Sequence, residues 1–419
     1  MQLEDFAEYF SLTAGIKDFI SRYGFTAMAD SLETVPDSLD EKFILQQLNL
    51  LHDPPPAEPL LKAAQEIRSS KYLLSCYNYL DYYWFRAPKM VMYGTELPGY
   101  GMNPLHTEQE GLYYLLNALA SFPYIARKYA ALGLPGHYAE DTVQYLSGAL
   151  TEYAAGHDNK LGITGRKLHW FSFYVQGKLF RIGRFEYMIQ DPLNYLPAAY
   201  KQRTNGKVIA LCRHNWLLAA DGSLLFDSDS PAEAYKIATL ENDGKSISGI
   251  PVNPEGFAEV DRRVTLDLAE YIPLWNNWDL VPGLHIPGGG NMTPEACCDS
   301  LNQALDFFPR YFKRQVTAVS CFSWIFNPDF EKELPESNLA KFMRQLYLFP
   351  FASVGVEGLA FVFGKHNEDW ENFPADNSLR RAFHRIHASG RRLRAGGMFI
   401  TPEAIRNFGE SFYRRNYDI

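Results

Sequence analysis

Hydrophobic positions recur at helical spacing through the first 155 residues of the chain. The stretch FILQQLNLL (43–51) places apolar residues on one helical face, and the prolines of HDPPPAEP (52–59) interrupt it. Longer periodic runs follow over 60–85, 108–133 and 140–157. This pattern predicts a helical N-terminal domain over residues 1–155.

The pattern changes near residue 165, where short alternating segments begin. LHWFSFYV (168–175) is aromatic and β-branched, QG (176–177) suits a tight turn, and KLFRIGRFEYMI (178–189) alternates. We therefore expect a β-hairpin here. Further strands are expected over 207–219 and 223–226, around an Asp221–Gly222 turn.

The remaining segments alternate between strands and helices. We expect strands at VPGLHIP (281–287), VTAVSCFSWIF (316–326) and GLAFVFG (358–364), and helices from Thr293 to about 312 and over 337–349. The fold class is therefore α+β (mixed α/β). The second domain would span 156–419, with a β-rich insertion at about 190–275.

The composition of the chain argues against several classes of function. A formal net charge of −9 argues against nucleic acid as a partner. The longest apolar runs fall short of the ~20 residues of a membrane span, and the acidic start MQLEDFAEYF is unlike a secretory signal, so we expect a cytoplasmic protein without membrane contact. The five cysteines and ten histidines lack the spacing of metal sites, and we expect no metal.

Three consecutive glycines, 288–290, separate an expected strand from an expected helix. Asn291 and Thr293 are residue types that cap helices, Pro294 suits the first helical position, and Glu295 complements the helix dipole. Glycines let a ligand approach the backbone, and amides at a helix start attract phosphate. The alternative is a flexible loop ahead of a capped helix.

Four stretches carry a resemblance to a known family: LFRIGRFEY (179–187), LHIPGGGNMTPEACCDSL (284–301), CFSWIFNPDFEKELPESNLAKF (321–342) and SLRRAFHRIHASG (378–390). They resemble bacterial acyltransferase-domain proteins, which join a helical N-acyltransferase N-terminal domain to a C-terminal domain like that of the GNAT superfamily of N-acetyltransferases. The resemblance implies acetyl-CoA or another acyl-CoA as co-substrate and a small-molecule or peptide amine as acceptor.

The resemblance also implies where the cofactor binds. The glycine turn would hold the pyrophosphate on its amides, and the preceding strand would bind the pantetheine arm. The turn departs from the superfamily pattern, because Pro287 precedes the glycines where Gln or Arg usually begins the motif. The cofactor-binding residues expected on this basis are Leu284, Ile286, Gly288, Gly289, Gly290, Asn291 and Asn338.

Direct acyl transfer to an amine requires a base, and two residues are candidates. His285 lies on the expected cofactor strand, and its ordinary pKa suits proton transfer near neutrality. Glu186 would share one face of its strand with Ile182 and Arg184. The alternatives are a structural histidine and a structural Arg184–Glu186 pair.

Other residues would complete the site. Ser323 could polarise the carbonyl or the thiolate, and Trp324 beside it would contact substrate, as would Arg184. Tyr347, in the helix expected over 337–349, would protonate the leaving thiolate, as tyrosines do in many superfamily members. Asn338 could equally be a helix cap.

An arginine-rich segment, RRAFHRIHASGRRLR (380–394), has an apolar helical stripe opposite its arginines. The arginines form a solvated face or contact the CoA phosphates. The whole sequence favours an acyl-CoA-dependent N-acyltransferase. The alternative is a non-catalytic protein that binds CoA or a small ligand with a degenerate GNAT fold.

Overall fold

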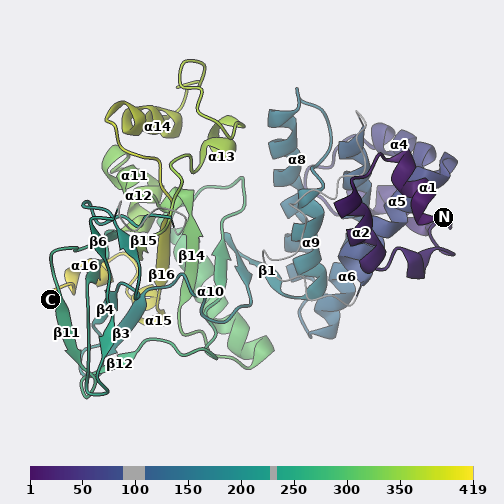
Figure 1. Ribbon diagram of the computed structural model, residues 1–419. Coiled ribbons are helices and arrows are strands. Elements are labelled where there is room, and N and C mark those ends of the chain that lie inside the picture. The colour runs from purple at the N-terminus through teal and green to yellow at the C-terminus, as the bar shows by residue number, and fades with distance from the viewer. Residues whose placement is uncertain (88–108, 227–233, 419) are drawn as a thin grey trace. The chain divides into compact units, whose positions relative to one another are not determined.

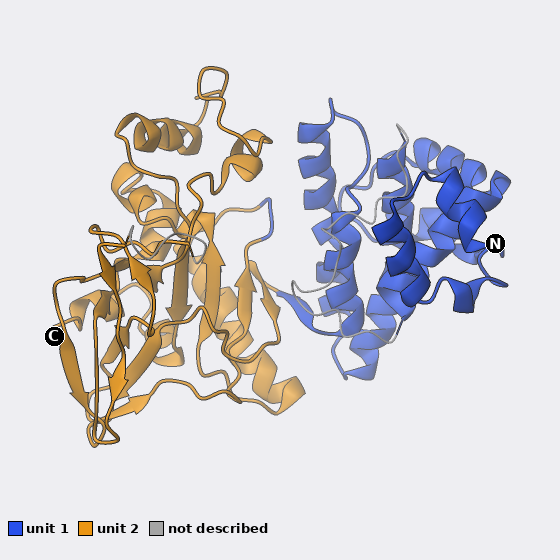
Figure 2. Ribbon diagram, in the orientation of Figure 1, with its two compact units in different colours: residues 1–181, 287–289 blue, residues 182–286, 290–419 orange. Residues whose placement is uncertain are grey.

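The computed structural model describes residues 1–87, 109–226 and 234–418. Two compact units divide the chain. One comprises Met1–Arg181 with Pro287–Gly289, and the other comprises Ile182–Ile286 with Gly290–Ile419 (Figure 2). The predicted domain limits, 1–155 and 156–419, stay a prediction.

The first unit is helical, as the apolar periodicity predicts (Figure 1). Its long helix α6 is buried along most of its length and packs against α3, α4, α5 and α9. The π-helical turn Tyr82–Arg86 extends α5. The helices are α1 (Leu3–Tyr9), α2 (Ala14–Arg22), α3 (Glu41–Leu48), α4 (Ala57–Ser69), α5 (Lys71–Asp81), α6 (Glu110–Ala131), α7 (His137–Val143), α8 (Tyr145–Gly156) and α9 (Arg166–Gln176).

Helix α9 corrects the expected hairpin. Residues 168–175 form a helix instead of a strand, because their aromatic side chains pack against α6 and the π-helical turn Tyr82–Arg86. Gly177 ends the helix with a left-handed φ of +67°, which is a helix C-cap instead of a hairpin turn. The hairpin lies just beyond, between β1 (Leu179–Ile182) and β2 (Phe185–Met188).

A six-stranded sheet organises the second unit, in the order β1-β2-β13-β14-β16-β15. Strands β13 and β14 are parallel, whereas the pairs β2–β13, β14–β16 and β15–β16 are antiparallel. The remaining strands are β13 (Gly283–His285), β14 (Val319–Ser323), β15 (Tyr347–Pro350) and β16 (Gly396–Ile400).

Helix α10 (Pro294–Phe312) covers one face of this sheet. Its Ser300 hydroxyl contacts the Tyr187 hydroxyl at 3.0 Å, and Phe308 packs edge-on against the Tyr187 ring. The Thr293 hydroxyl accepts from the Ala296 amide and caps the helix, so the helix and its cap are confirmed. Because side chains alternate along a strand, the residues on either side of Tyr187 point to the opposite face.

The β-rich segment between β2 and β13 covers part of that opposite face. Tyr347 donates its hydroxyl to the Val252 carbonyl, and Trp275 packs edge-on against Phe399. The segment holds a five-stranded sheet, a three-stranded sheet and a two-stranded ribbon. Their strands are β3 (Ala198–Gln202), β4 (Val208–Leu211), β5 (Leu217–Leu218), β6 (Lys236–Ile237), β7 (Glu241–Asn242), β8 (Ser246–Gly249), β9 (Pro251–Asn253), β10 (Phe257–Ala258), β11 (Val264–Asp267) and β12 (Tyr271–Pro273).

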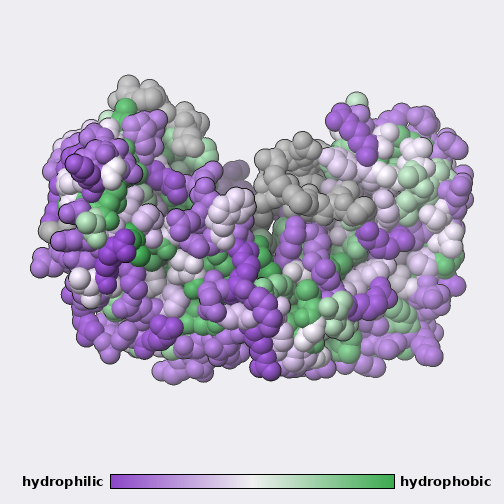
Figure 3. Space-filling model, turned by 90° about the horizontal axis from the view of Figure 1, so that it is seen from below, coloured by the Kyte–Doolittle hydropathy of each residue, from purple (hydrophilic) through white to green (hydrophobic). Residues whose placement is uncertain are grey.

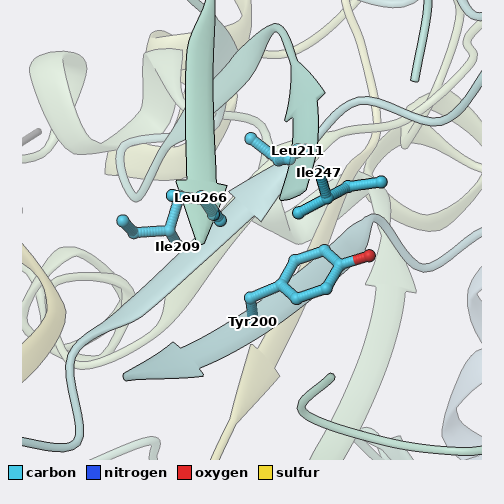
Figure 4. Close-up of a cluster of buried hydrophobic side chains, with 5 residues drawn as sticks. All are labelled: Tyr200, Ile209, Leu211, Ile247 and Leu266. Atoms are coloured by element: carbon cyan, nitrogen blue, oxygen red, sulfur yellow. The ribbon is translucent and has the colours of Figure 1, made fainter. Parts of the chain in front are cut away.

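Apolar side chains join the sheets of this segment. Five of them form a buried cluster between β3, β4, β8 and β11: Tyr200, Ile209, Leu211, Ile247 and Leu266 (Figure 4). Burial of such a cluster contributes roughly 25 cal/mol per Å² of apolar surface. The segment therefore has a hydrophobic core of its own, which stabilises it where it packs on the main sheet.

Two expected elements in the last third of the chain are wrong. The expected helix over 337–349 is the short helix α12 (Asn338–Met343) followed by β15, and the expected strand over 358–364 is the helix α13 (Leu359–Phe363). Glycines in left-handed conformations bracket α13. The other helices are α11 (Asp329–Glu333), α14 (Ser378–Ala388), α15 (Pro402–Arg406) and α16 (Phe412–Arg415), and α13 and α14 lie beyond one end of the main sheet (Figure 1).

Apolar residues reach the surface in separate areas among mostly hydrophilic ones (Figure 3). Across the described ranges, none of the helices combines the length and the hydropathy that a membrane crossing requires.

Candidate functional site

Glu186 and His285 stand opposite each other on β2 and β13. The antiparallel register pairs Gly283 with Met188, Leu284 with Tyr187, and His285 with Glu186. Paired residues project to the same face with their Cβ atoms about 5 Å apart. Since Tyr187 points toward α10, Glu186 and His285 point to the opposite face of the sheet.

Both candidate bases lie in a largely desolvated place. Glu186 is 1% exposed, and burial lowers the pKa of His285 to about 4. The imidazole is therefore neutral at pH 7 and has a lone pair with which to accept a proton, but the lowered pKa makes it a weaker base than the ordinary histidine that the sequence predicts. A buried carboxylate directly across the ladder would stabilise the imidazolium that this transfer creates.

Pairing between β13 and β14 stops early. The described contacts between the two strands begin with a bridge between Leu280 and Val316 and end with the Gly283–Ser320 pair. Strand β14 then continues to Ser323, paired with β16 on its other side. The backbone edges of β13 and β14 that face each other beyond this point can bind an extended ligand through hydrogen bonds.

The glycine turn follows β13 directly. Gly289 and Gly290 have φ angles of +73° and +72°, a left-handed conformation that favours glycine. Residues 288–290 and Asn291 are exposed, and an added Cβ at Gly288 or Gly289 would meet open space. The turn thus presents its backbone to solvent at the start of a 19-residue helix, where amides and dipole favour an anion.

Arg184 brings a positive charge to this turn. It lies in the two-residue turn between β1 and β2, and its Nη2 is 3.4 Å from the Gly290 carbonyl oxygen. Ser300 on α10 holds the hairpin in place, donating to the Ile182 carbonyl and accepting from the Phe185 amide. The hairpin is therefore tied to α10, the helix that follows the glycine turn and begins at Pro294.

This placement corrects the expected strand face. Ile182, Arg184 and Glu186 do not share one face, because the strand breaks at the Gly183–Arg184 turn. Gly183 has a φ of +60°, which the two-residue turn requires. Arg184 therefore lies beside the glycine turn, whereas Glu186 lies opposite His285.

Ser323 and Trp324 lie at the end of β14. Ser323 pairs with Gly396, so it points to the α10 side of the sheet, away from His285, and its hydroxyl accepts from the Ile325 amide at 3.4 Å. Trp324 is half-buried and stacks with Phe361 at a ring distance of 6.0 Å. Leu284 and Ile286, which the sequence predicts to bind the cofactor, flank His285, and Leu284 lies on the α10 face.

Tyr347 lies apart from this group. It belongs to a strand instead of a helix, and β14 and β16 separate it from β13, which is roughly 14 Å at ~4.8 Å per strand. Its buried hydroxyl donates to the Val252 carbonyl and accepts from the Ala210 amide, and burial raises its pKa. Tyr347 therefore holds the β-rich segment to the sheet.

The remaining candidates lie on the helices α12 and α14. Asn338 is the exposed first residue of α12, and the cap is the neighbouring Ser337, whose hydroxyl accepts from the Ala340 amide. On α14, Arg380 pairs with Asp376 and Arg385 pairs with Glu333. These ion pairs support the reading of a solvated face for the arginine-rich segment.

Two residues beside the candidate site are not predicted by the sequence. Ser300 positions the hairpin, and Phe322 on β14 is 41% exposed although it lies in the middle of the sheet order. A serine inside an amphipathic helix and a phenylalanine inside a strand carry no distinguishing sequence signal. Among the described residues, no cluster of three histidine, cysteine or carboxylate side chains could hold a metal ion.

A family model described as the GNAT-like C-terminal domain matches residues 179–399. Among curated proteins, no sequence matches this chain. The match begins at β1 and ends one residue before the end of β16, so it covers nearly all of the main sheet, the glycine turn and the β-rich segment.

Several solved structures share the fold of the chain. A mutant acyltransferase in complex with octanoyl-CoA and an acyltransferase in complex with CoA and 10C-teicoplanin each have a TM-score of 0.61 and 18% identity. An acyltransferase in complex with decanoyl-CoA and teicoplanin has a TM-score of 0.57 and 17% identity. Each likeness covers 96% of this chain and 99% of the other.

Proposed function

Because this chain belongs to the family with a GNAT-like C-terminal domain, we propose that it transfers an acyl group from acyl-CoA to the amine of a small molecule or peptide. The observation that carries the proposal is the glycine turn between β13 and α10, with its backbone exposed and Arg184 beside it. The similar structures were solved with octanoyl-CoA, decanoyl-CoA and teicoplanin, which supports an acyl-CoA donor and a peptide-like acceptor here.

Cofactor binding would use three groups of this chain. The amides of residues 288–290 and the start of α10 would bind the pyrophosphate. Arg184 would add a cation from the hairpin, taking the place of the Gln or Arg that the turn itself lacks. The pantetheine arm would lie along β13 where its pairing with β14 ends, bound by the backbone of Leu284 and Ile286.

The reaction would proceed by direct transfer. His285 would take a proton from the ammonium form of the acceptor, and the freed amine nitrogen would attack the thioester carbonyl carbon. A carbon–nitrogen bond forms, the carbon–sulfur bond breaks, and CoA leaves as a thiolate that takes up the second proton lost by the acceptor nitrogen. Glu186, opposite His285, would stabilise the imidazolium and orient the ring.

The test is calorimetric titration of the purified chain with acetyl-CoA, octanoyl-CoA and CoA, followed by a thiol-release assay with amine acceptors. We expect micromolar binding of at least one acyl-CoA and amine-dependent thiol release. Failure of the chain to bind any of the three ligands would refute the proposal. Binding without turnover across the acceptors would favour the non-catalytic CoA-binding alternative.

A further inference from the structure

Phe322 is an exposed aromatic residue where a central strand would ordinarily bury one. It belongs to β14, which has β13 on one side and β16 on the other, yet 41% of its surface is exposed. The β-rich segment covers Phe399 on the neighbouring strand β16 and Tyr347 on β15 beyond it, and both residues are 0% exposed. An exposed apolar side chain beside a buried face of this kind indicates a place for a ligand.

The ring of Phe322 is fixed by two other aromatic residues. It stacks on Phe351 with the ring centroids 4.7 Å apart and the planes within 10°. Tyr195 packs against Phe322 at 4.9 Å and against Phe351 at 5.7 Å, edge-on in both contacts. We call these three residues the aromatic platform. A rigid platform loses little conformational entropy when a second aromatic group stacks on it.

The sheet register places this platform on the same face as the candidate bases. Gly283 and Ser320 are the last pair of the parallel ladder, and because side chains alternate along each strand, His285 and Phe322, each two residues further on, project to the same face. The Tyr195 hydroxyl lies 3.3 Å from the Ser320 hydroxyl, which confirms that Tyr195 is on that face. Phe322 and His285 therefore border the point where β13 and β14 part.

From this geometry, and resting on the proposed function, we infer that the acceptor carries an aromatic group that stacks on the platform through Phe322. The acceptor amine would then lie toward His285, on the face opposite α10. The acyl-CoA would approach from the glycine turn, so donor and acceptor meet between β13 and β14. The substrate class is an aromatic amine or a peptide with an aromatic side chain near the acylated nitrogen.

The test compares the parent protein with Phe322→Leu, which keeps an apolar side chain but removes the ring. Saturation-transfer NMR would measure binding of phenethylamine and of hexylamine, with and without octanoyl-CoA. Tyr235→Leu is the matched control, because Tyr235 is 56% exposed in the β-rich segment. Calorimetry with octanoyl-CoA on all three proteins tests the donor site separately.

We expect saturation transfer to phenethylamine in the parent protein and in Tyr235→Leu, with at least a threefold loss in Phe322→Leu. Saturation transfer to hexylamine should be weaker than that to phenethylamine, and it should be the same in Phe322→Leu as in the parent protein. The inference would be overturned if phenethylamine gave equal saturation transfer in all three proteins. It would also be overturned if phenethylamine gave no saturation transfer in any of them. A tenfold loss of octanoyl-CoA affinity in Phe322→Leu would overturn it too, because the platform would then hold the acyl chain. If none of the three proteins bound octanoyl-CoA, the proposed function would be refuted instead. The NMR measurements of amine binding without octanoyl-CoA would still test the inferred aromatic site.

Discussion

Glu186 and His285 are cross-strand partners on the face of the main sheet that α10 leaves uncovered. One is a carboxylate and the other an imidazole whose burial keeps it neutral at pH 7. They come from segments about 100 residues apart, and only the pairing of β2 with β13 unites them. This relationship means that only the folded chain brings the two candidate bases together.

The first prediction concerns the division of labour in this pair. His285→Gln should lower kcat by about 10²–10⁴-fold with little change in acyl-CoA affinity, because it removes the base. Glu186→Gln should lower kcat less, because the base remains. Steady-state kinetics with calorimetry would measure both, and the double variant should lose little more than His285→Gln alone. A larger loss in Glu186→Gln would make the carboxylate the base.

The glycine turn provides a second prediction. Gly289→Glu should reduce acyl-CoA affinity more than about 100-fold, because it places a side chain and a negative charge where phosphate would bind, on a backbone with a φ of +73°. Gly133→Glu is the matched control, since Gly133 has a φ of +74° and open space around it. Calorimetric titration of both variants decides the matter. Equal affinities would mean that the turn is only a loop ahead of a helix.

Arg184 carries a third prediction. Arg184→Gln should weaken acyl-CoA binding about tenfold and make the affinity less sensitive to salt, because one charge-assisted contact to phosphate is lost. Arg203→Gln is the control. Arg203 also lies at a hairpin turn and donates to a backbone carbonyl, that of Ala269. An unchanged affinity in Arg184→Gln across 50–500 mM salt would leave Arg184 a purely structural residue.

Sequence patterns predicted the elements whose signals are local. The helix after the glycine turn, with Thr293 as its cap, follows from capping residue types and apolar periodicity. The strand predicted over 168–175 is wrong. Aromatic and β-branched residues favour strands in isolation, but burial against α6 selects a helix here. Gly177, two residues beyond this stretch, ends the helix as its C-cap, although a Gln-Gly pair also suits a hairpin turn.

The site depends on contacts that sequence patterns do not contain. The sequence indicates both His285 and Glu186 as candidate bases, but no local sequence pattern shows that the two residues are cross-strand partners. Arg184 was expected beside Glu186, and a two-residue turn moves it to the glycines instead. Tyr347 has the residue type and the approximate sequence position of the tyrosine that protonates the thiolate in many superfamily members. The strand order nevertheless places it far from β13.

Tyr347 provides a fourth prediction. Tyr347→Phe removes a buried hydroxyl that bonds the Val252 carbonyl and the Ala210 amide, so it should lower the free energy of unfolding by about 1–3 kcal/mol. The specific activity of the folded enzyme should stay within a factor of about two. Urea unfolding and the thiol-release assay would measure the two quantities. A loss of kcat above 100-fold at unchanged stability would restore Tyr347 as the catalytic acid.

The pKa of His285 provides the last prediction. In the folded protein it is about 4, against an ordinary 6.5, so the unfolded chain binds the proton first as the pH falls. Stability from this residue is therefore complete above pH 6.5 and is lost between pH 6.5 and 4, by about 2 kcal/mol at pH 5. His285→Gln should lose correspondingly less stability between pH 7 and pH 5 in urea unfolding, and the acidic limb of kcat/KM should fall near pH 4. A limb near pH 6.5, with equal acid sensitivity of the two proteins, would show that His285 titrates like a solvated histidine and would contradict a neutral, buried base.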